Sequence, residues 1–393
     1  MNIELFRQSP SGSVIRHGYG DAAYWAFVPH PLPPKLMLDL PLVQALSSAD
    51  RALGELAGLG RNMPNPHLLI QPFIRREAVL SSRIEGTQAD VADLYAYEAG
   101  QLMLPGFRAV ASESDVREVL NYVHALEYGL ERIKEFPLSL RVLRELHERL
   151  MRGTRGEHLT PGEFRRTQNW IGGYGVGLQD AAYVPPPVDE MNDALGDFER
   201  YLHVEGGYPP LVRLGLIHYQ FEAIHPFLDG NGRIGRLLIT LLLVHWDLLP
   251  LPLLYLSAYF EEQRQHYYDR LMNVSTQGDW HSWLTFFLTG VTEQANDAIQ
   301  RAKKLQDLAA LWQSQLQQTN ATALMHHVAN LLAERPILSA QDICTNFDVS
   351  HQTAMRAIQR LIEIGILAKI DDRRRNQHFL ARQIVEIIQN SDG

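Results

Sequence analysis

The chain has 393 residues, of which 46% are hydrophobic and 21% are charged, and this composition is typical of globular proteins with about two or three domains. Its single cysteine, Cys344, excludes an internal disulfide and favours a reducing compartment, so we expect a cytoplasmic location. The net charge of −9 argues against a surface that binds nucleic acid throughout, but it leaves room for a local basic patch. The most apolar run, residues 237–246, is too short to cross a bilayer, and we expect no membrane contact.

The predicted elements begin with a Pro-rich, extended segment over residues 1–35. Apolar residues at helical spacing then predict helices from about residue 39 to residue 150. Residues 154–190 are rich in Gly and Pro and contain short stretches that favour strands, so they predict a hairpin or flap. Helices resume after residue 190 and continue to about residue 316.

From about residue 322 the pattern changes to a helix, then a helix, a turn and a further helix that Ser350 can cap, followed by two short strands around a polar turn. Three helices with a two-stranded wing are typical of a winged helix. We therefore predict a mainly α fold with a small β-hairpin flap and a C-terminal winged-helix domain. The predicted division is a helical region over residues 1–110, a helical core over 111–316 and the winged helix over 321–393.

The most distinctive chemistry lies in "HPFLDGNGRIGR", residues 225–236. Gly230, Gly232 and Gly235 match the dinucleotide pattern G-x-G-x-x-G, but the preceding residues 211–224 have helical rather than strand spacing, which excludes a Rossmann context. The chain also lacks a P-loop sequence. A Gly-rich turn that leads into a helix can still bind phosphate through its main-chain N–H groups.

The charged side chains of this motif fit a phosphate site. Arg233 and Arg236 lie three residues apart, so they share a face in the first helical turn, where two cations are unfavourable unless an anion binds. Asp229 can hold a Mg²⁺ ion that bridges phosphates. His225, across the loop, can take a proton from an incoming hydroxyl.

The motif resembles the signature of Fic domains in the Fic/Doc family, H-P-F-x-[DE]-G-N-G-R-x-x-R, at every specified position. The resemblance extends over roughly residues 40–300 and includes "FRRTQNWIGG", residues 164–173. It implies a helical core that transfers AMP from ATP, with Mg²⁺, to a Ser, Thr or Tyr hydroxyl of a target protein or of the chain itself. His225 is then the general base, and Asp229 is the Mg²⁺ ligand. The implied nucleotide-binding residues are Glu85, His225, Gly230, Asn231, Gly232, Arg233, Ile234, Gly235 and Arg236.

Two other functions stay open at this point. In the related Doc branch the position of Asp229 is basic and a phosphate is transferred, so Asp229 favours AMP transfer over a Doc-like protein kinase. The second alternative is a DNA-binding regulator, in which the core senses nucleotide and the winged helix contacts DNA. Many relatives form dimers, so we also expect a homodimer.

A second short motif, "SSRIEG" at residues 81–86, resembles the inhibitory motif [ST]-x-x-x-E-[GN], with Ser81, Glu85 and Gly86 at the specified positions. The resemblance implies that Glu85 pairs with Arg236 and displaces the γ-phosphate, so that ATP binds without productive geometry. The alternative is an ordinary surface acid near a helix end. In some family members the same Glu supports the removal of AMP, and that role stays open here.

Two further segments carry predictions about partners. "AAYVPPP", residues 181–187, resembles the target-binding flap of the family, in which Ala182, Tyr183 and Val184 pair with the main chain of the target. The alternative is a purely structural hairpin. In the winged-helix domain, contact with DNA and contact with protein are both open. The residues predicted to contact DNA are Gln352, Thr353, Arg356 and Arg374.

Overall fold

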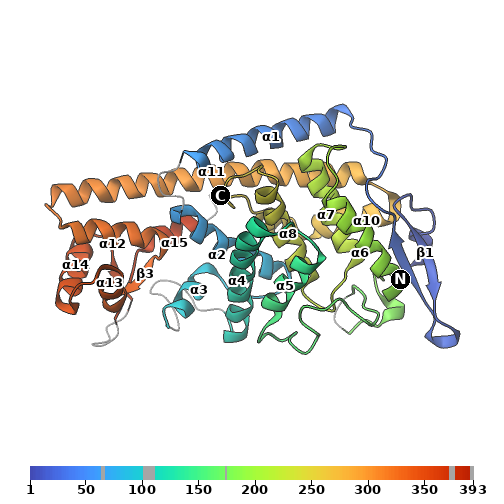
Figure 1. The fold of residues 1–393 in the computed structure, drawn as a ribbon, viewed down its shortest axis with the longest axis horizontal. Coiled ribbons are helices and arrows are strands. Elements are labelled where there is room, and N and C mark those ends of the chain that lie inside the picture. Colours follow the sequence, from blue (N-terminus) through green and yellow to red (C-terminus); the bar gives the residue numbers. More distant parts are fainter. Residues whose placement is uncertain (63–66, 101–110, 173–174, 371–376, 390–393) are drawn as a thin grey trace. The chain divides into compact units, whose positions relative to one another are not determined.

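The structure is a computed structural model that describes residues 1–62, 67–100, 111–172, 175–370 and 377–389 (Figure 1). The described residues are mainly helical with small antiparallel sheets, which confirms the predicted mainly α class. The chain divides into a first unit, residues 1–57 and 121–295, and a second unit, residues 58–120 and 296–393. The division of the sequence into 1–110, 111–316 and 321–393 stays a prediction.

The first unit combines helices with one hairpin. In the hairpin, β1 (Gly12–His17) pairs antiparallel with β2 (Tyr24–Pro29). The sequence predicts only extended chain here, so this prediction was incomplete. The helices within the first unit are α5 (Leu140–Met151), α6 (Val188–Leu202), α7 (Pro210–Ile224), α8 (Asn231–His245), α9 (Ser257–Glu262) and α10 (Arg264–Gln277). Short 3₁₀ turns lie at Ile3–Leu5, Gly20–Ala22 and Leu178–Asp180.

The helices α7 and α8 are the most deeply buried part of the first unit. Nearly every residue of both is buried, because apolar side chains occupy most positions of these segments rather than one face. The two helices approach closely at Gly235, where a Cβ would come within 2.3 Å of Glu222 Oε1. Glycine at this position therefore permits the close packing of α7 and α8 on either side of the turn at residues 225–230.

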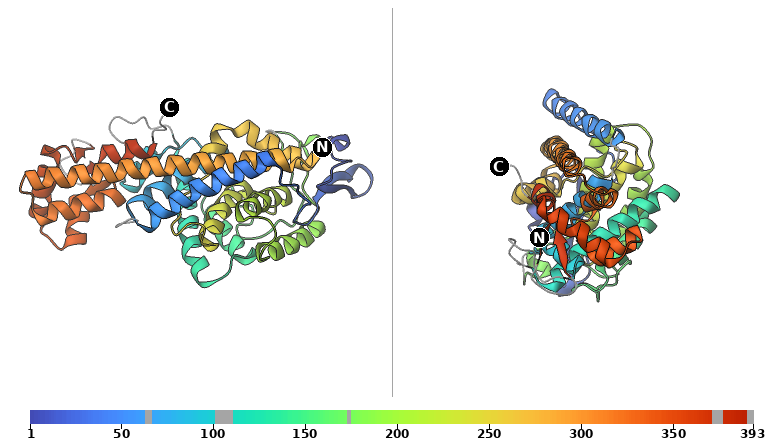
Figure 2. Two further views of the ribbon diagram at one scale, coloured as in Figure 1. Left: turned by 90° about the horizontal axis from the view of Figure 1, so that it is seen from above. Right: turned by 90° about the vertical axis from the view of Figure 1, so that its left-hand side faces the viewer.

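Three long helices supply residues to both units: α1 (Leu40–Arg61), α4 (Glu113–Glu135) and α11 (Trp280–Gln318). The left view of Figure 2 shows α11 as one continuous helix. None of the described helices combines the length with the apolar character that a bilayer-spanning segment requires.

The second unit packs helices from both ends of its sequence around one another. Helix α12 (Ala323–Glu334) packs against α2 (His67–Ile84), and α15 (Arg382–Gln389) packs against α2 and α3 (Val91–Glu98). Arg76 and Arg301 both pair with Asp297, at 3.3 and 2.8 Å. The helices are α2 (His67–Ile84), α3 (Val91–Glu98), α12 (Ala323–Glu334), α13 (Ala340–Phe347), α14 (His351–Glu363) and α15 (Arg382–Gln389). The strands β3 (Ile337–Ser339), β4 (Ala368–Lys369) and β5 (His378–Leu380) form a sheet in the order β3-β5-β4.

The order of elements from α12 to β5 is helix, strand, helix, helix, strand, strand. Both strand pairs, β3 with β5 and β4 with β5, are antiparallel. The winged-helix assignment of residues 321–393 stays a prediction.

Candidate active site

His225 ends α7 in a left-handed backbone conformation, with φ 50° and ψ 61°. Residues other than glycine seldom adopt this conformation, and here neighbouring side chains support it. Arg165 Nε and Asn169 Nδ2 both donate to the carbonyl oxygen of His225, at 3.1 and 3.2 Å. His225 Nδ1 lies 3.3 Å from the carbonyl oxygen of Glu222, which can only accept, so in the neutral ring the proton is on Nδ1 and the lone pair is on Nε2. A general base needs this form of the imidazole.

The turn between His225 and α8 is shaped by Gly230 and Asn231. Gly230 has φ +79°, and a Cβ there would lie 3.0 Å from Met151 Sδ, so glycine is favoured on both counts. Asn231 Oδ1 accepts from Phe227 N, and Asn231 Nδ2 donates to Phe227 O, each at 2.8 Å. Because the Asn231 side chain is engaged in this way, its predicted contribution to an anion site must come from its main-chain N–H.

The first turn of α8 gathers positive charge. The first N–H groups of a helix have no partner within the helix, and they carry partial positive charge. Arg233 and Arg236 are only 4% and 2% exposed. Arg233 Nη2 lies 3.6 Å from Asp229 Oδ1, and Asp229 Oδ1 also accepts from Gly230 N at 2.6 Å. The turn therefore presents main-chain donors and two guanidinium groups where an anion can bind.

Ile234 lies in the first turn of α8, between the two arginines. Its N–H donates to Gly230 O at 3.1 Å, and its side chain is fully buried. Ile234 thus anchors the start of α8 in the core, and its contact with a nucleotide stays a prediction.

His147 of α5 supports the motif loop through hydrogen bonds and ring stacking, a role that was not predicted from the sequence. Gly162 N donates to His147 Nδ1 and His147 Nε2 donates to Asp229 O, each at 2.9 Å. The His147 ring stacks on Phe227, with 3.8 Å between centroids and 6° between planes. His147 is 1% exposed, and this burial lowers its pKa to about 4. The ring is therefore neutral at pH 7, as its accepting Nδ1 requires.

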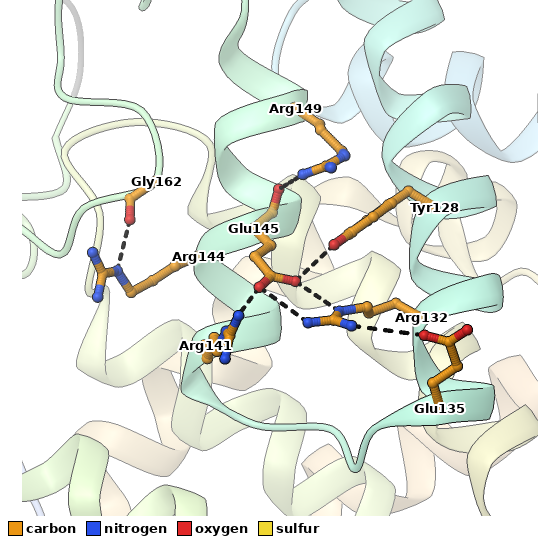
Figure 3. A network of polar contacts seen from close by, with 8 residues as sticks. All are labelled: Tyr128, Arg132, Glu135, Arg141, Arg144, Glu145, Arg149 and Gly162. Atoms are coloured by element: carbon orange, nitrogen blue, oxygen red, sulfur yellow. Dashed lines mark hydrogen bonds and ion pairs between the residues drawn. The ribbon is translucent and has the colours of Figure 1, made fainter.

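The carbonyl of Gly162 is held in turn by α5 (Figure 3). Arg144 Nε donates to Gly162 O at 2.7 Å. The next residue, Glu145, accepts hydrogen bonds from Arg132 and Tyr128 of α4 at 3.0 and 2.7 Å, and from Arg141 at 3.0 Å. Burial alone would raise the pKa of Glu145, but these three donors bring it down to about 2. The network fixes α5 against α4, and α5 carries both Arg144 and His147.

Acid should destabilise the native state through His147. In the unfolded chain a His takes up a proton near pH 6.5, whereas buried His147 has a pKa of about 4. The unfolded state therefore binds more protons below pH 6.5, and the free energy of unfolding should fall by about 2 kcal/mol for this residue between pH 7 and pH 5. Denaturant titrations at both pH values measure the change. His147→Gln should show a shallower fall, and an equal fall in both proteins would contradict the assignment.

The range from pH 7 to pH 5 limits the contribution of other titrating groups to the measured change. Glu145, with its pKa of about 2, loses its stabilising effect only below the usual carboxylate range, so it contributes little above pH 5. His218 acts in the same direction as His147, because burial together with Arg236 lowers its pKa to about 3. Its contribution is common to the native chain and the His147→Gln variant.

The segment predicted as the flap forms an isolated bridge between Ile171 and Tyr183 and is held by hydrogen bonds on both sides. Tyr183 exchanges two main-chain hydrogen bonds with Ile171, at 2.8 and 3.1 Å, and Val184 O accepts from Phe27 N of β2 at 2.9 Å. The Tyr183 side chain is buried and its hydroxyl donates to Ala223 O of α7 at 2.8 Å. Ala182, by contrast, is exposed. The target-binding role of Ala182, Tyr183 and Val184 stays a prediction, and the Tyr183 side chain serves to attach the flap to α7.

The other predicted site residues lie in the second unit. Ser81 is buried in α2, and the helix ends just before Glu85, where Gly86 has φ +99°. Gln352, Thr353 and Arg356 are exposed on α14. Arg374 lies outside the described residues. The structure thus brings His225, Asp229 and the residues from Gly230 to Arg236 together in the first unit, and the roles of Ser81, Glu85 and Gly86 stay predictions.

Comparison with known proteins identifies the family. Residues 43–131 match the Fic/DOC family N-terminal model, and residues 137–243 match the Fic/DOC family model. The chain belongs to the Fic/Doc family. The second match contains all of α7, the whole turn and most of α8.

Curated Fic/Doc relatives include the protein adenylyltransferase Fic of Culex quinquefasciatus, which is 30% identical over 165 residues, or 41% of this chain and 29% of the relative. The protein adenylyltransferase Fic of Drosophila grimshawi is 30% identical over 186 residues, or 46% of this chain and 34% of the relative. This chain therefore spans about a third of the length of these relatives. A solved Fic family protein from Desulfovibrio desulfuricans shares the fold, with a TM-score of 0.57 and 22% identity over 89% of this chain and 98% of that one.

Proposed function

We propose that this Fic/Doc chain transfers AMP from ATP to a Ser, Thr or Tyr hydroxyl of a target protein, or of the chain itself, and releases pyrophosphate. One observation carries the proposal. A single short turn separates His225, held by Arg165 and Asn169, from the buried guanidinium groups of Arg233 and Arg236 at the start of α8. A proton acceptor beside an anion site is what phosphoryl-group chemistry on a hydroxyl requires.

The proposed reaction assigns a task to each part of the turn. The N–H groups of the first α8 turn and the two arginines bind the triphosphate. The hydroxyl oxygen of the target attacks the α-phosphorus, and the bond from that phosphorus to the bridging oxygen of pyrophosphate breaks. His225 Nε2 takes the hydroxyl proton. The positive groups are fixed before the reaction, so they stabilise the charge that develops on the phosphate oxygens without reorganising.

The residues present also fit the Mg²⁺ that such a reaction implies. Among the described residues, no group of three acidic, His or Cys side chains could hold a metal alone, but Mg²⁺ with a nucleotide commonly takes one carboxylate and completes its shell with phosphate oxygens and water. The Asp229 side chain is 46% exposed, and at Gly156 a Cβ would come within 2.6 Å of Asp229 Oδ2. Asp229 would hold the ion, which supplies positive charge to the phosphates.

We also propose that Ser81, Glu85 and Gly86 form an inhibitory motif that lowers this activity. The resemblance of "SSRIEG" to the inhibitory pattern supports the proposal. The local backbone is suited to present a side chain just after a helix, since Glu85 N and Thr87 N both donate to Ser82 O, at 3.1 and 3.2 Å. Glycine at position 86 accommodates the positive φ of this turn.

The position of the label in ATP separates AMP transfer from a Doc-like kinase. The full chain is incubated with Mg²⁺ and a cell extract, using ATP labelled at either the α- or the γ-phosphate. We expect α-label in protein and no γ-label, because the α-phosphorus stays on the target while pyrophosphate leaves. Label from γ-ATP alone would establish the kinase instead, and mass spectrometry of the labelled band identifies the target and its modified residue.

A further inference from the structure

The segment 340–363 of the second unit consists of two helices joined by a three-residue turn. Helix α13 ends at Phe347, Asp348 has φ 51°, and Ser350 caps α14 by accepting from Thr353 N at 3.3 Å. The two helices pack against each other, and α14 also contacts α12. Two helices joined by so short a turn, with a third behind them, are the arrangement that presents the second helix to a DNA groove.

Helix α14 has two chemically different faces. The buried residues are all apolar: Ala354, Ala357, Ile358 and Leu361. The exposed residues are all polar or charged: His351, Gln352, Thr353, Arg356, Gln359, Arg360 and Glu363. The helix therefore uses one side for the core of the unit and presents a hydrophilic surface on the other.

This surface suits nucleic acid better than protein. The centre of a protein interface is depleted in charge and enriched in apolar and aromatic residues, whereas a DNA interface is polar and positively charged. Of the exposed cations, Arg356 lies in the middle of α14 and Arg360 in its last turn, and Lys369 is exposed on β4. The acids Asp348 and Glu363 lie only at the two ends of the helix. Arg and Gln are also the side chains that bond bidentately to guanine and adenine edges.

We propose that the second unit binds double-stranded DNA, with α14 lying in the major groove. Gln352, Arg356 and Gln359 follow one another at spacings of four and three residues, so they share a face that meets the base edges. Arg360 and Lys369 contact phosphates. This function uses none of the residues of the AMP-transfer site.

Thr353 also has a structural role at the start of α14, and its predicted contact with DNA stays a prediction. Its hydroxyl lies 3.0 Å from Ser350 Oγ, and its N–H donates to the same oxygen. Thr353 is therefore part of the cap that fixes the start of α14. Arg374 lies outside the described residues and forms no part of the proposed surface.

The test uses the full chain and fluorescently labelled duplexes of random sequence, about 30 base pairs long. Fluorescence anisotropy measures binding between about 50 and 200 mM salt. We expect binding at the lowest salt that weakens steeply as salt rises, with a log–log slope of about −2 to −4 for two to four phosphate contacts. Repeated selection of the bound duplexes should enrich a common sequence, because base edges are contacted as well as phosphates.

Variants of the exposed face separate its two kinds of contact. Arg356→Ala with Arg360→Ala removes one base contact and one phosphate contact, so it should weaken binding about tenfold at the lowest salt and make the slope shallower by about 1. Gln359→Ala should lower the preference for the enriched sequence and leave binding to random duplex nearly unchanged. The matched control Arg382→Ala removes one charge from α15, which packs against α2 and α3, and should change affinity by less than about twofold.

Two outcomes would overturn the proposal: no duplex binding by the native chain at the lowest salt, or equal weakening by the Arg356/Arg360 double variant and by Arg382→Ala. All these side chains are exposed, so thermal unfolding should show unchanged stability. His225→Ala should bind DNA as the native chain does. DNA binding and AMP transfer can therefore fail or succeed separately.

Discussion

Replacing His225 by alanine should lower the rate of AMP transfer by roughly 10²- to 10⁴-fold, the usual contribution of a positioned general base. The reason lies in the geometry of the residue. Its left-handed backbone is braced by Arg165 and Asn169, and its Nδ1 proton faces the Glu222 carbonyl, so Nε2 is left in the form that accepts a proton. The rate is measured as α-labelled AMP on the target per unit time with saturating ATP.

Two further measurements test whether the lower rate comes from loss of the base itself. ATP binding to His225→Ala should change far less than the rate, because in the proposed reaction most contacts to the triphosphate come from the first turn of α8. His245→Ala is a matched control, since it removes an exposed imidazole from the other end of α8. If His225→Ala retained the native rate, another group would be the base and the proposed mechanism would be wrong.

Replacing Glu85 by glycine should raise the rate of AMP transfer by about ten- to a hundredfold. In the inhibited state that the family resemblance implies, the Glu85 carboxylate pairs with the guanidinium of Arg236. The γ-phosphate then cannot bind to that guanidinium. A hydrogen bond to a charged group contributes about 1.5–3 kcal/mol, which corresponds to this range of rates. The measurement is again α-label incorporation, with native chain and variant at equal concentration.

A second variant distinguishes the charge from the backbone. Glu85→Gln keeps the length of the side chain and the backbone preferences but removes the negative charge, so it should also activate, though less than Glu85→Gly. Activation by glycine alone would point to a more flexible turn at Gly86 rather than to a competing carboxylate. A rate that stayed constant or fell in both variants would remove the inhibitory role from this motif.

Local patterns predict much of this fold, since helices are encoded by residues close in sequence. The apolar residues of 211–224 and 237–246 place α7 and α8, and Ser350 caps α14 where its side chain predicts. The hairpin β1–β2 was missed, because the turn between the paired residues His17 and Tyr24 carries no Asn-Gly or Asp-Gly signal. Its anchor, the bond from Phe27 N to Val184 O, joins residues too far apart for any local pattern.

In the candidate site, too, the features encoded by neighbouring residues were predicted and the contacts between distant segments were not. The residues with reactive side chains, His225, Asp229 and the two arginines, stand in one contiguous motif and were predicted from it. The residues that hold the motif in shape come from distant segments: His147 is 82 residues from Asp229, and Arg165 is 60 residues from His225. In the sequence, His147 looks like any polar residue on an amphipathic helix. For Arg165 and Asn169 the only signal is the family resemblance of the segment that contains them.

Asn231 and Gly232 form an Asn-Gly pair, the sequence in which an amide is most readily lost with time through attack by the following main-chain nitrogen. Here that nitrogen belongs to the first turn of α8, and the side-chain oxygen and nitrogen of Asn231 are both hydrogen-bonded to the main chain of Phe227. Attack would require the turn to unwind, and the carboxylate it produced would face the carbonyl oxygen of Phe227. The two hydrogen bonds that shape this turn thus also guard it against chemical ageing, for as long as the chain stays folded.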